Sequence, residues 1–478
     1  MPRRSNHAVL AVLLALPVAA PAASRDTQDI SALLAERSAR DGQVARQIWE
    51  WAELGYKEQQ SSALLQAELK AAGFAIATGV AGMPTAFVAT AGSGKPVIGM
   101  LAEFDALPGL SQDAVPQRSP LREAAPGHGC GHHLFGTAST SAAIALRKWL
   151  ANNAASGTIR VYGTPAEEGG AGKVYMVRAG LFDDVDAVLA WHPDSVNTAS
   201  VETSNANRSA KFRFFGASSH AASSPDRGRS ALDGVEAMDH MVNLLREHVP
   251  QEARIHYVIT SGGLAPNVVP DFAEVYYYVR HPDPRMLDEI WARVVKAAEG
   301  AALGTETRVE HEIIHAVYSL LRNETLAKVM DRELRAVGGV HYDAQEREFA
   351  QELQKTMPPP VRPLGTEEQI QPFRLEQRYG STDVGDVSWV VPTAQVRTAT
   401  FVPGTPGHSW QAVAAGGMSI GFKGMNVAAQ TLARTAVALY RDPAILQEAR
   451  REFAALRGPD FKYRALLGER APPLNYRD

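Results

Sequence analysis

The chain contains a single cysteine, Cys130, which lies in a glycine-rich turn between histidines. The stretch reads GHGCGHH from residue 127 to residue 133. Thiolate and imidazole are both ligands of divalent transition metals, although a Cys-X-His spacing alone does not identify a metal site. A second feature is the adjacent pair Glu167-Glu168. One carboxylate of such a pair could bind a metal while the other takes a proton from water, so the two features together indicate metal-assisted hydrolysis.

Short apolar runs precede these residues and predict buried parallel strands. The runs lie in KPVIGMLAEFDALPG, GTIRVYGTPAEEGG and DAVLAWHPD, and helical stretches such as GTASTSAAIALRKWLANN lie between them. This alternation predicts an open, mostly parallel α/β sheet. Ligands bind at the carboxyl ends of such strands, so we expect the polar residues that follow the runs to gather at one edge of the sheet. These residues are Asp105, Cys130, His132, Glu167, Glu168 and His192.

A different pattern occupies about residues 205–315. A strand in KFRFFGASSHAA, a helix near residues 230–248, two strands, a further helix and a last strand in ETRVEHEIIHAV give the order βαββαβ. That order predicts an inserted ferredoxin-like α+β unit. Residues 24–204 and 316–478 would form the two parts of one catalytic domain. The charged tail from residue 451 onward is expected to be irregular and to pack on the surface.

Residues 1–23 combine a basic start, an apolar run and small residues. They predict a secretory signal peptide rather than an uncleaved anchor, because the run is too short to span a bilayer. The mature chain is then expected in the periplasm or outside the cell, free of the membrane. In an oxidising compartment, coordination to a metal would protect a lone thiol. The net charge of −4 gives no reason to expect nucleic acid as a partner.

Seven motifs occur in the order in which they are found in the M20 family of metallopeptidases and amidohydrolases. They are HGCGHHLFG, GTPAEEGG, AWHPD, GASSHAA, GGLAPNVVPD, GSTDVGDVSW and PGHSW. From about residue 38 onward, the chain resembles the aminoacylase-type branch of this family. The resemblance implies a catalytic domain of the zinc-peptidase type (phosphorylase/hydrolase-like) with an inserted lid and dimerisation domain. It also implies two divalent metal ions, and the ligand types suit zinc, manganese and cobalt alike.

The resemblance also assigns roles to residues of the catalytic domain. The implied metal ligands are Cys130, His132, Glu168, His192 and His408, with the thiolate of Cys130 bridging the two ions. Glu167 would be the general base. Asp105 would orient a ligand histidine, and His128 is expected beside the ligands rather than among them. Glu103 stands where other branches have a metal-binding histidine, whose place His132 would take.

Roles for four further residues stay open at this point. His220 would stabilise the oxyanion of the tetrahedral intermediate, often across a dimer in this family, and Asn267 would bind the substrate carboxylate or the same oxygen. Both could instead be turn residues. Arg280 could pair with a substrate carboxylate or with a structural acid. His133 replaces the usual aspartate or asparagine, and it could orient a ligand, bind a metal or cap the following helix.

The implied reaction is hydrolysis of the amide bond between an acyl group, expected to be aromatic, and an amino acid. One candidate substrate is p-aminobenzoyl-glutamate, and a dipeptidase or aminoacylase of broader specificity is the alternative. A second copy of the chain, joined through the lid, is the expected partner. Two other hypotheses compete. A Cys130 nucleophile activated by His132 leaves Glu167-Glu168 and His408 unexplained. A periplasmic binding protein with a metal-stabilised fold would need no base at Glu167.

Overall fold

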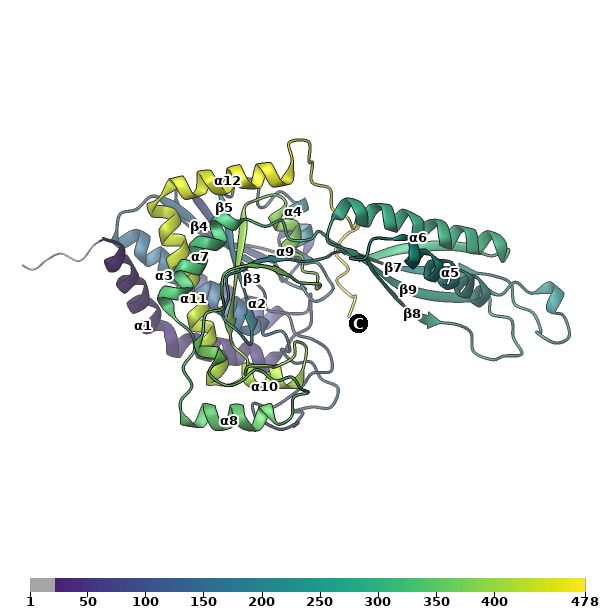
Figure 1. Ribbon diagram of the computed structural model, residues 1–478, viewed down its shortest axis with the longest axis horizontal. Coiled ribbons are helices and arrows are strands. Elements are labelled where there is room, and N and C mark those ends of the chain that lie inside the picture. Colours follow the sequence, from purple (N-terminus) through teal and green to yellow (C-terminus); the bar gives the residue numbers. More distant parts are fainter. Residues whose placement is uncertain (1–21, 478) are drawn as a thin grey trace, which may run out of the picture.

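The computed structural model describes residues 22–477, so nearly all of the predicted signal peptide lies outside the described residues. A large α/β body carries a slender second unit that projects from one side (Figure 1). Within residues 22–477, no helix is both long enough and apolar enough to cross a membrane.

The body is built on a six-stranded sheet with the order β1-β2-β4-β3-β5-β12. The four strands β4, β3, β5 and β12 are mutually parallel. Strand β2 runs antiparallel to both of its neighbours, β4 and the edge strand β1. Every residue of β3 is buried, which explains its continuous apolar run. The strands are β1 (Ala75–Thr78), β2 (Phe87–Ser93), β3 (Val97–Ala102), β4 (Gly157–Gly163), β5 (Ala187–Asp194) and β12 (Thr393–Ala399). The predicted open, mostly parallel sheet is therefore confirmed.

One central helix, α3 (His132–Asn152), packs against β3, β4 and β5 and also against α1 and α11. It is buried without interruption from His132 to Leu146, and small residues such as Gly136 and Ala138 allow its close approach to the strands. Because α3 begins directly after Cys130, this packing fixes the position of the cysteine turn. The other helices of the body are α1 (Ala22–Trp51), α2 (Gln59–Ala71), α4 (Gly172–Arg178), α7 (Glu324–Val337), α8 (Ala344–Gln354), α9 (Val384–Ser388), α10 (Trp410–Gly416), α11 (Ser419–Arg441) and α12 (Pro443–Arg457).

The projecting unit has the order βαββαβ and an antiparallel sheet β10-β7-β9-β8, as predicted for a ferredoxin-like fold. Its helix α6 begins with Pro284 after the N-cap Asp283, whose side chain accepts a hydrogen bond from a backbone N–H. The elements are β7 (Ala206–Phe215), α5 (Ala231–Leu245), β8 (Arg254–Ser261), β9 (Phe272–His281), α6 (Pro284–Gly304) and β10 (Arg308–Val317). We call this unit the lid.

The remaining elements of the body and the lid are short. Strands β6 (Val201–Thr203) and β11 (Leu375–Gln377) form a small parallel pair beside the start of the lid. Single turns of 3₁₀ helix are η1 (Val80–Gly82), η2 (Pro225–Arg227), η3 (Arg246–His248) and η4 (Thr366–Glu368).

The carboxyl-terminal residues differ from the expectation of an irregular surface tail. Helix α12 continues to Arg457, because its apolar residues recur at helical spacing. Residues 458–477 then run back between the body and the lid (Figure 1). Backbone carbonyls at Gly468 and Arg470 accept hydrogen bonds from Arg178, and the Tyr463 hydroxyl donates to Asp386. The segment therefore ends at the catalytic side of the body.

Candidate active site

A cavity of about 740 Å³ opens where the parallel strands end, and the body and the lid both contribute to its walls. Its lining includes Cys130, Glu167, Glu168, His192 and His408. Asp105 and His132 are buried directly behind this lining. The six residues expected to gather at one sheet edge, together with His408 from the far end of the chain, thus lie in one place.

Asp105 joins two segments of the site. One carboxylate oxygen lies 2.8 Å from His132 Nδ1, and the other accepts a hydrogen bond from the Glu168 backbone N–H at 2.9 Å. With Nδ1 engaged, Nε2 is the atom of His132 that faces the site. This Nε2 lies 3.0 Å from Glu103 Oε2, but without the alignment of a hydrogen bond. Asp105 therefore has the geometry expected of an acid that orients a metal ligand.

The His192 ring is oriented in the same way. Its Nδ1 donates to the Pro193 carbonyl at 2.7 Å, which leaves Nε2 3.4 Å from the Cys130 sulfur. From the opposite side, His408 Nε2 lies 3.1 Å from Glu168 Oε1. Both histidines therefore present the ring atom that a metal would use.

Two groups of potential metal ligands share one atom. Cys130, His132 and His192 form one group, and Cys130, Glu168 and His408 form another, with the ligand atoms of each lying within 4.8 Å of one another. Only the Cys130 sulfur belongs to both groups. Two buried atoms, His132 Nε2 and Glu168 Oε1, have no hydrogen-bond partner within residues 22–477. Sulfur, nitrogen and oxygen donors with free lone pairs fit a divalent transition metal.

The electrostatics of the cluster favour a cation. Burial lowers the pKa of His132, but the Cys130 thiol and the acids Asp105 and Glu103 outweigh that effect and raise it well above its usual value. The close approach of Cys130 and of the Glu168 carboxylate raises the pKa of His408 to about 11. These histidines hold positive charge in the protein alone, so a metal cation can replace their protons.

Glu167 differs from its neighbour. Its carboxylate accepts no hydrogen bond from the part of the chain that the structure describes, and it lies within 4.8 Å of ligand atoms of His132 and Glu168. Burial, followed by the charges of Glu103 and Glu168, raises its pKa well above the usual value. A carboxylate with a raised pKa and no hydrogen-bond donor, beside the potential metal ligands, is suited to act as a general base.

His128 and His133 face away from the ligands. His128 Nε2 donates to the Ile48 carbonyl at 3.1 Å, and His133 Nε2 donates to the Gly416 carbonyl at 2.9 Å. Burial lowers the pKa of both rings, to about 3 for His128. The two histidines therefore tie the start of α3 to α1 and α10. His128 binds no ligand side chain through its described hydrogen bond, and it stays a prediction that it supports the site from beside the ligands. The hydrogen bond of His133 to Gly416 matches neither a metal-binding nor a ligand-orienting role.

His220 and Asn267 lie together at the far end of the lid. Residue 220 forms a β-bridge with Val268, both side chains are exposed, and neither lines the cavity of its own chain. Strand β7 has ten residues, and at about 3.3 Å each they cover roughly 30 Å between the cavity wall at Asn207 and the turn that carries His220. The structure thus brings the two lid residues to each other and not to the metal ligands of the same chain.

Sequence reasoning missed a buried charge cluster behind the site. Lys173 is completely buried, and its Nζ lies 2.7 Å from Glu103 Oε1 and 2.6 Å from Asp383 Oδ1. Although burial opposes it, the two acids raise the pKa of Lys173. Asp383 lies in GSTDVGDVSW, so the motif offered a signal. Nothing in the sequence distinguishes Lys173 from a surface lysine. The cluster holds Glu103 against the site, in the place of the absent ligand histidine.

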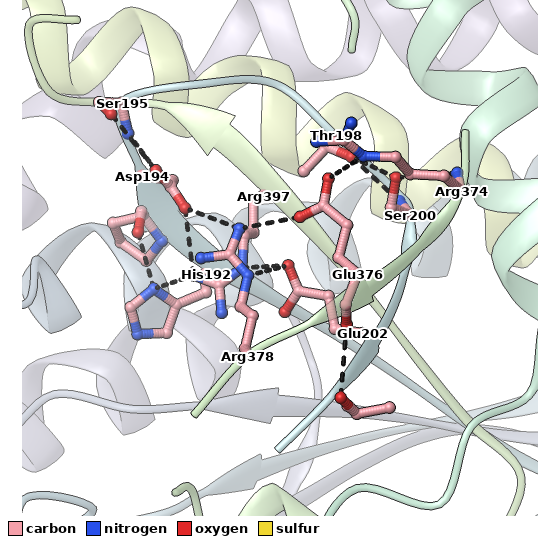
Figure 2. A network of polar contacts seen from close by, with 12 residues as sticks. His192, Asp194, Ser195, Thr198, Ser200, Glu202, Arg374, Glu376, Arg378 and Arg397 are labelled. Atoms are coloured by element: carbon pink, nitrogen blue, oxygen red, sulfur yellow. Dashed lines mark hydrogen bonds and ion pairs between the residues drawn. The ribbon is translucent and has the colours of Figure 1, made fainter. Parts of the chain in front are cut away.

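Arginines form much of the remaining cavity wall. Figure 2 shows Arg397 between Glu202 and Asp194, close to His192, with Arg378 beside the same two acids. Arg397 lies 3.3 Å from Asp194 Oδ2, and Arg378 lies 2.9 Å from Glu202 Oε1. These acids are therefore neutralised by the wall itself. Apart from the potential metal ligands and Glu167, the lining carries four arginines, Arg280, Arg378, Arg397 and Arg477, and three acids, Glu103, Asp194 and Glu202. Of these acids, Glu103 is paired with Lys173 behind the wall.

Residues 100–362 match the family model of peptidase family M20/M25/M40, which is more than half of the chain. The chain belongs to this family. It is 44% identical to a p-aminobenzoyl-glutamate hydrolase subunit of Escherichia coli K12 over 436 residues, which cover 86% of this chain and 91% of that protein. It is 31% identical to the Xaa-Arg dipeptidase of Mus musculus, over 87% of this chain and 90% of that one.

Solved structures agree with the fold. An aminobenzoyl-glutamate utilization protein from Klebsiella pneumoniae superposes with a TM-score of 0.60 at 19% identity, covering 85% of this chain and 97% of that one. A Bacillus subtilis peptidase of the M20 family, described as binding a dinuclear metal, gives 0.58 at 19% identity, over 84% and 98%. The M20 membership predicted from the motifs is confirmed, and the protein is a metallohydrolase that acts on amide bonds.

The two adjacent glutamates should respond differently to the same substitution. Glu167→Gln should retain metal and lose about 10²- to 10⁴-fold in kcat, because only the proton acceptor is removed. Glu168→Gln should lower metal content, because a ligand oxygen is lost. Metal analysis and steady-state kinetics measure both, with the exposed Glu36→Gln as a control that should change neither. Metal loss in the first variant with full occupancy in the second would reverse the assignment.

Proposed function

We propose that this M20 enzyme hydrolyses an N-acyl acidic amino acid with an aromatic acyl group, such as p-aminobenzoyl-glutamate. Two arginines of the cavity wall, Arg280 and Arg477, carry this proposal, because neither forms an ion pair within residues 22–477, whereas Glu103, Asp194 and Glu202 are each paired with a basic side chain. Unpaired positive charge in the wall favours an anionic substrate. Tyr278, Tyr379 and Phe401 also line the cavity and offer apolar surface to an aromatic ring. The name of the Escherichia coli relative supports the same substrate class.

For the metal, we propose two divalent ions held by the two ligand groups that share the Cys130 sulfur. The description of the Bacillus subtilis peptidase as dinuclear supports this number, and zinc, manganese and cobalt all suit the ligands. When bound, such ions would lower the pKa of a water molecule and polarise the amide carbonyl. Glu167 accepts the proton of the attacking water and can return it to the leaving amine. Asp105 fixes the position of the His132 ring relative to the loop that carries Glu167.

Other activities fit the cavity less well. A dipeptidase that prefers a basic residue, as the name of the mouse relative states, would need an acid free to pair with the substrate. Asp194 and Glu202 are each already paired with an arginine. A mechanism with Cys130 as the nucleophile would give no role to Glu168 and His408, although both lie beside the sulfur. A binding protein would have no use for the unpartnered carboxylate of Glu167. The predicted signal peptide adds the proposal that the enzyme acts in the periplasm or outside the cell.

Removing the metal should abolish hydrolysis, and adding back a divalent ion should restore it. Chelator-treated protein, verified by metal analysis, would be compared with protein reloaded with zinc, manganese or cobalt. The substrates would be p-aminobenzoyl-glutamate, N-acetyl-glutamate and Xaa-Arg dipeptides. The aromatic acyl-glutamate should give the highest kcat/KM because it matches both the charge and the aromatic lining. Full activity without metal, or a preference for Xaa-Arg dipeptides, would contradict the proposal.

We further propose that two copies associate through their lids. Strand β8 is an edge strand with exposed apolar side chains, Tyr257, Val258 and Ile259, beside the exposed Leu264. Monomeric proteins normally protect such an edge, and pairing it with a second copy would cover it. In that dimer, His220 and Asn267 at the end of one lid could enter the cavity of the other chain. Because the Escherichia coli relative is named as one subunit of a hydrolase, the alternative partner is a different polypeptide.

Mixing two defective proteins tests whether the sites are shared. His220→Ala should lower kcat by about 10²- to 10³-fold, the usual effect of losing one oxyanion donor. Glu167→Gln should lower kcat because it removes the general base. In heterodimers, one site would carry both defects and the other neither, so part of the activity should return. Each variant alone, put through the same mixing, is the control. No recovery in verified heterodimers, or a monomer by light scattering, would oppose a shared site.

A further inference from the structure

The last described residues of the chain meet the catalytic loop after β4. The Tyr476 hydroxyl donates to the Glu168 backbone carbonyl at 3.0 Å, and the Arg477 guanidinium donates to the same oxygen. The loop that carries the base and a metal ligand is thus held from one side by Asp105 and from the other by a segment about 300 residues away in the sequence.

The body provides a fitted seat for this segment. The Tyr56 ring meets the Tyr476 ring edge to face at 5.7 Å, and the Tyr56 hydroxyl donates to the Gly170 carbonyl. A Cβ added at Gly55 would lie 2.3 Å from the Tyr476 hydroxyl oxygen, so glycine is needed there for the close approach. The position of Tyr476 is therefore defined by packing, and Arg477 follows it directly.

Arg477 extends from this seat into the cavity wall. It lines the same cavity as the metal ligands and Arg280. Lid strand β9 contributes Tyr278 and Arg280 to the lining of this cavity. Arg477 and Arg280 therefore reach one cavity from two different segments, the carboxyl-terminal residues and the lid.

Two of the four cavity arginines lack an acidic partner. Arg378 and Arg397 are neutralised by Asp194 and Glu202, whereas Arg280 and Arg477 form no ion pair with any acid in residues 22–477. The Nε atoms of Arg280 and Arg477 are buried without a hydrogen-bond partner in that part of the chain. Each guanidinium lies over a tyrosine ring, Arg280 over Tyr278 and Arg477 over Tyr476, but neither has an opposite charge beside it. A partly buried cation without a counter-charge costs free energy, so a bound anion would be favoured at each.

We propose that Arg477 is a substrate-binding residue that holds one carboxylate of a dianionic substrate, while Arg280 holds the other. One guanidinium nitrogen, Nη2, donates to the Glu168 carbonyl, and the side chain also lines the cavity, where its other N–H donors can pair with a carboxylate. This assignment rests on the proposed function, and it names the residues that would hold the two carboxylates of the acidic amino acid. It also gives the carboxyl-terminal segment a role in specificity.

The test compares two substrates that differ in a single charge, p-aminobenzoyl-glutamate and p-aminobenzoyl-glutamine. Arg477→Gln should raise KM for the glutamate substrate by roughly 10- to 100-fold, as expected for one lost charge-assisted contact, and should change KM for the glutamine substrate little. Arg477→Lys should give a smaller effect in the same direction, because the charge stays and the paired donors are lost. With two variants of Arg477, the comparison can still be made if one of them fails to fold.

Two further variants separate binding from positioning. Tyr476→Phe removes the other donor to the Glu168 carbonyl without changing charge, so it should leave the preference between the two substrates unaltered. Arg451→Gln removes an exposed arginine of α12 that is paired with Glu448, and should change neither KM nor kcat. Metal content and melting temperature of each variant show whether the site remains intact.

The outcomes are distinct. Hydrolysis of both substrates by the unaltered enzyme, with an equal effect of Arg477→Gln on each, would overturn the assignment of Arg477 and leave the proposed function standing. Failure of the unaltered enzyme to hydrolyse either substrate would overturn the proposed function and this assignment together. A selective rise in KM for the dianionic substrate supports both.

Discussion

The carboxylate of Asp105 is the contact on which the site depends. It lies just beyond the end of β3, completely buried, and it binds the His132 ring with one oxygen and the backbone of Glu168 with the other. Those two partners come from different elements, the start of α3 and the loop after β4. A buried carboxylate has to satisfy both oxygens, so its position sets the distance between the ligand histidine and the paired glutamates. The parallel sheet places all three segments at one edge, and Asp105 fixes their relation within it.

Much of this site could be predicted because parallel strands end at a common edge. The apolar runs of β3, β4 and β5 located Asp105, Glu167 and Glu168 at strand ends without any knowledge of their contacts. His192 lies within the last residues of β5 rather than beyond its end, and so it is still at the predicted edge of the sheet. His408 was identified from its motif alone, because a residue from a distant loop carries no periodic signal. The lid followed equally directly from its order of strands and helices.

The parts that sequence reasoning missed depend on partners far away in the chain. His128 and His133 adjoin the cysteine turn in sequence, yet their rings bond to carbonyls of α1 and α10, which no local pattern reveals. Lys173 is buried because Glu103 and Asp383 approach from separate segments. The charged composition of the carboxyl-terminal residues indicated a surface tail. Their backbone and tyrosines instead find partners on the body and on the end of the last lid strand, and their arginines donate to backbone carbonyls there.

The central claim is that the lone thiolate is a metal ligand, and X-ray absorption spectroscopy of the zinc-loaded protein tests it most directly. A sulfur scatterer at about 2.3 Å should appear beside nitrogen and oxygen scatterers at about 2.0 Å, and it should disappear in Cys130→Ser without loss of the nitrogen shell. Since Cys130 is the only cysteine of the chain, no other thiolate could supply the signal. A coordination shell of nitrogen and oxygen alone in the unaltered protein would contradict the account.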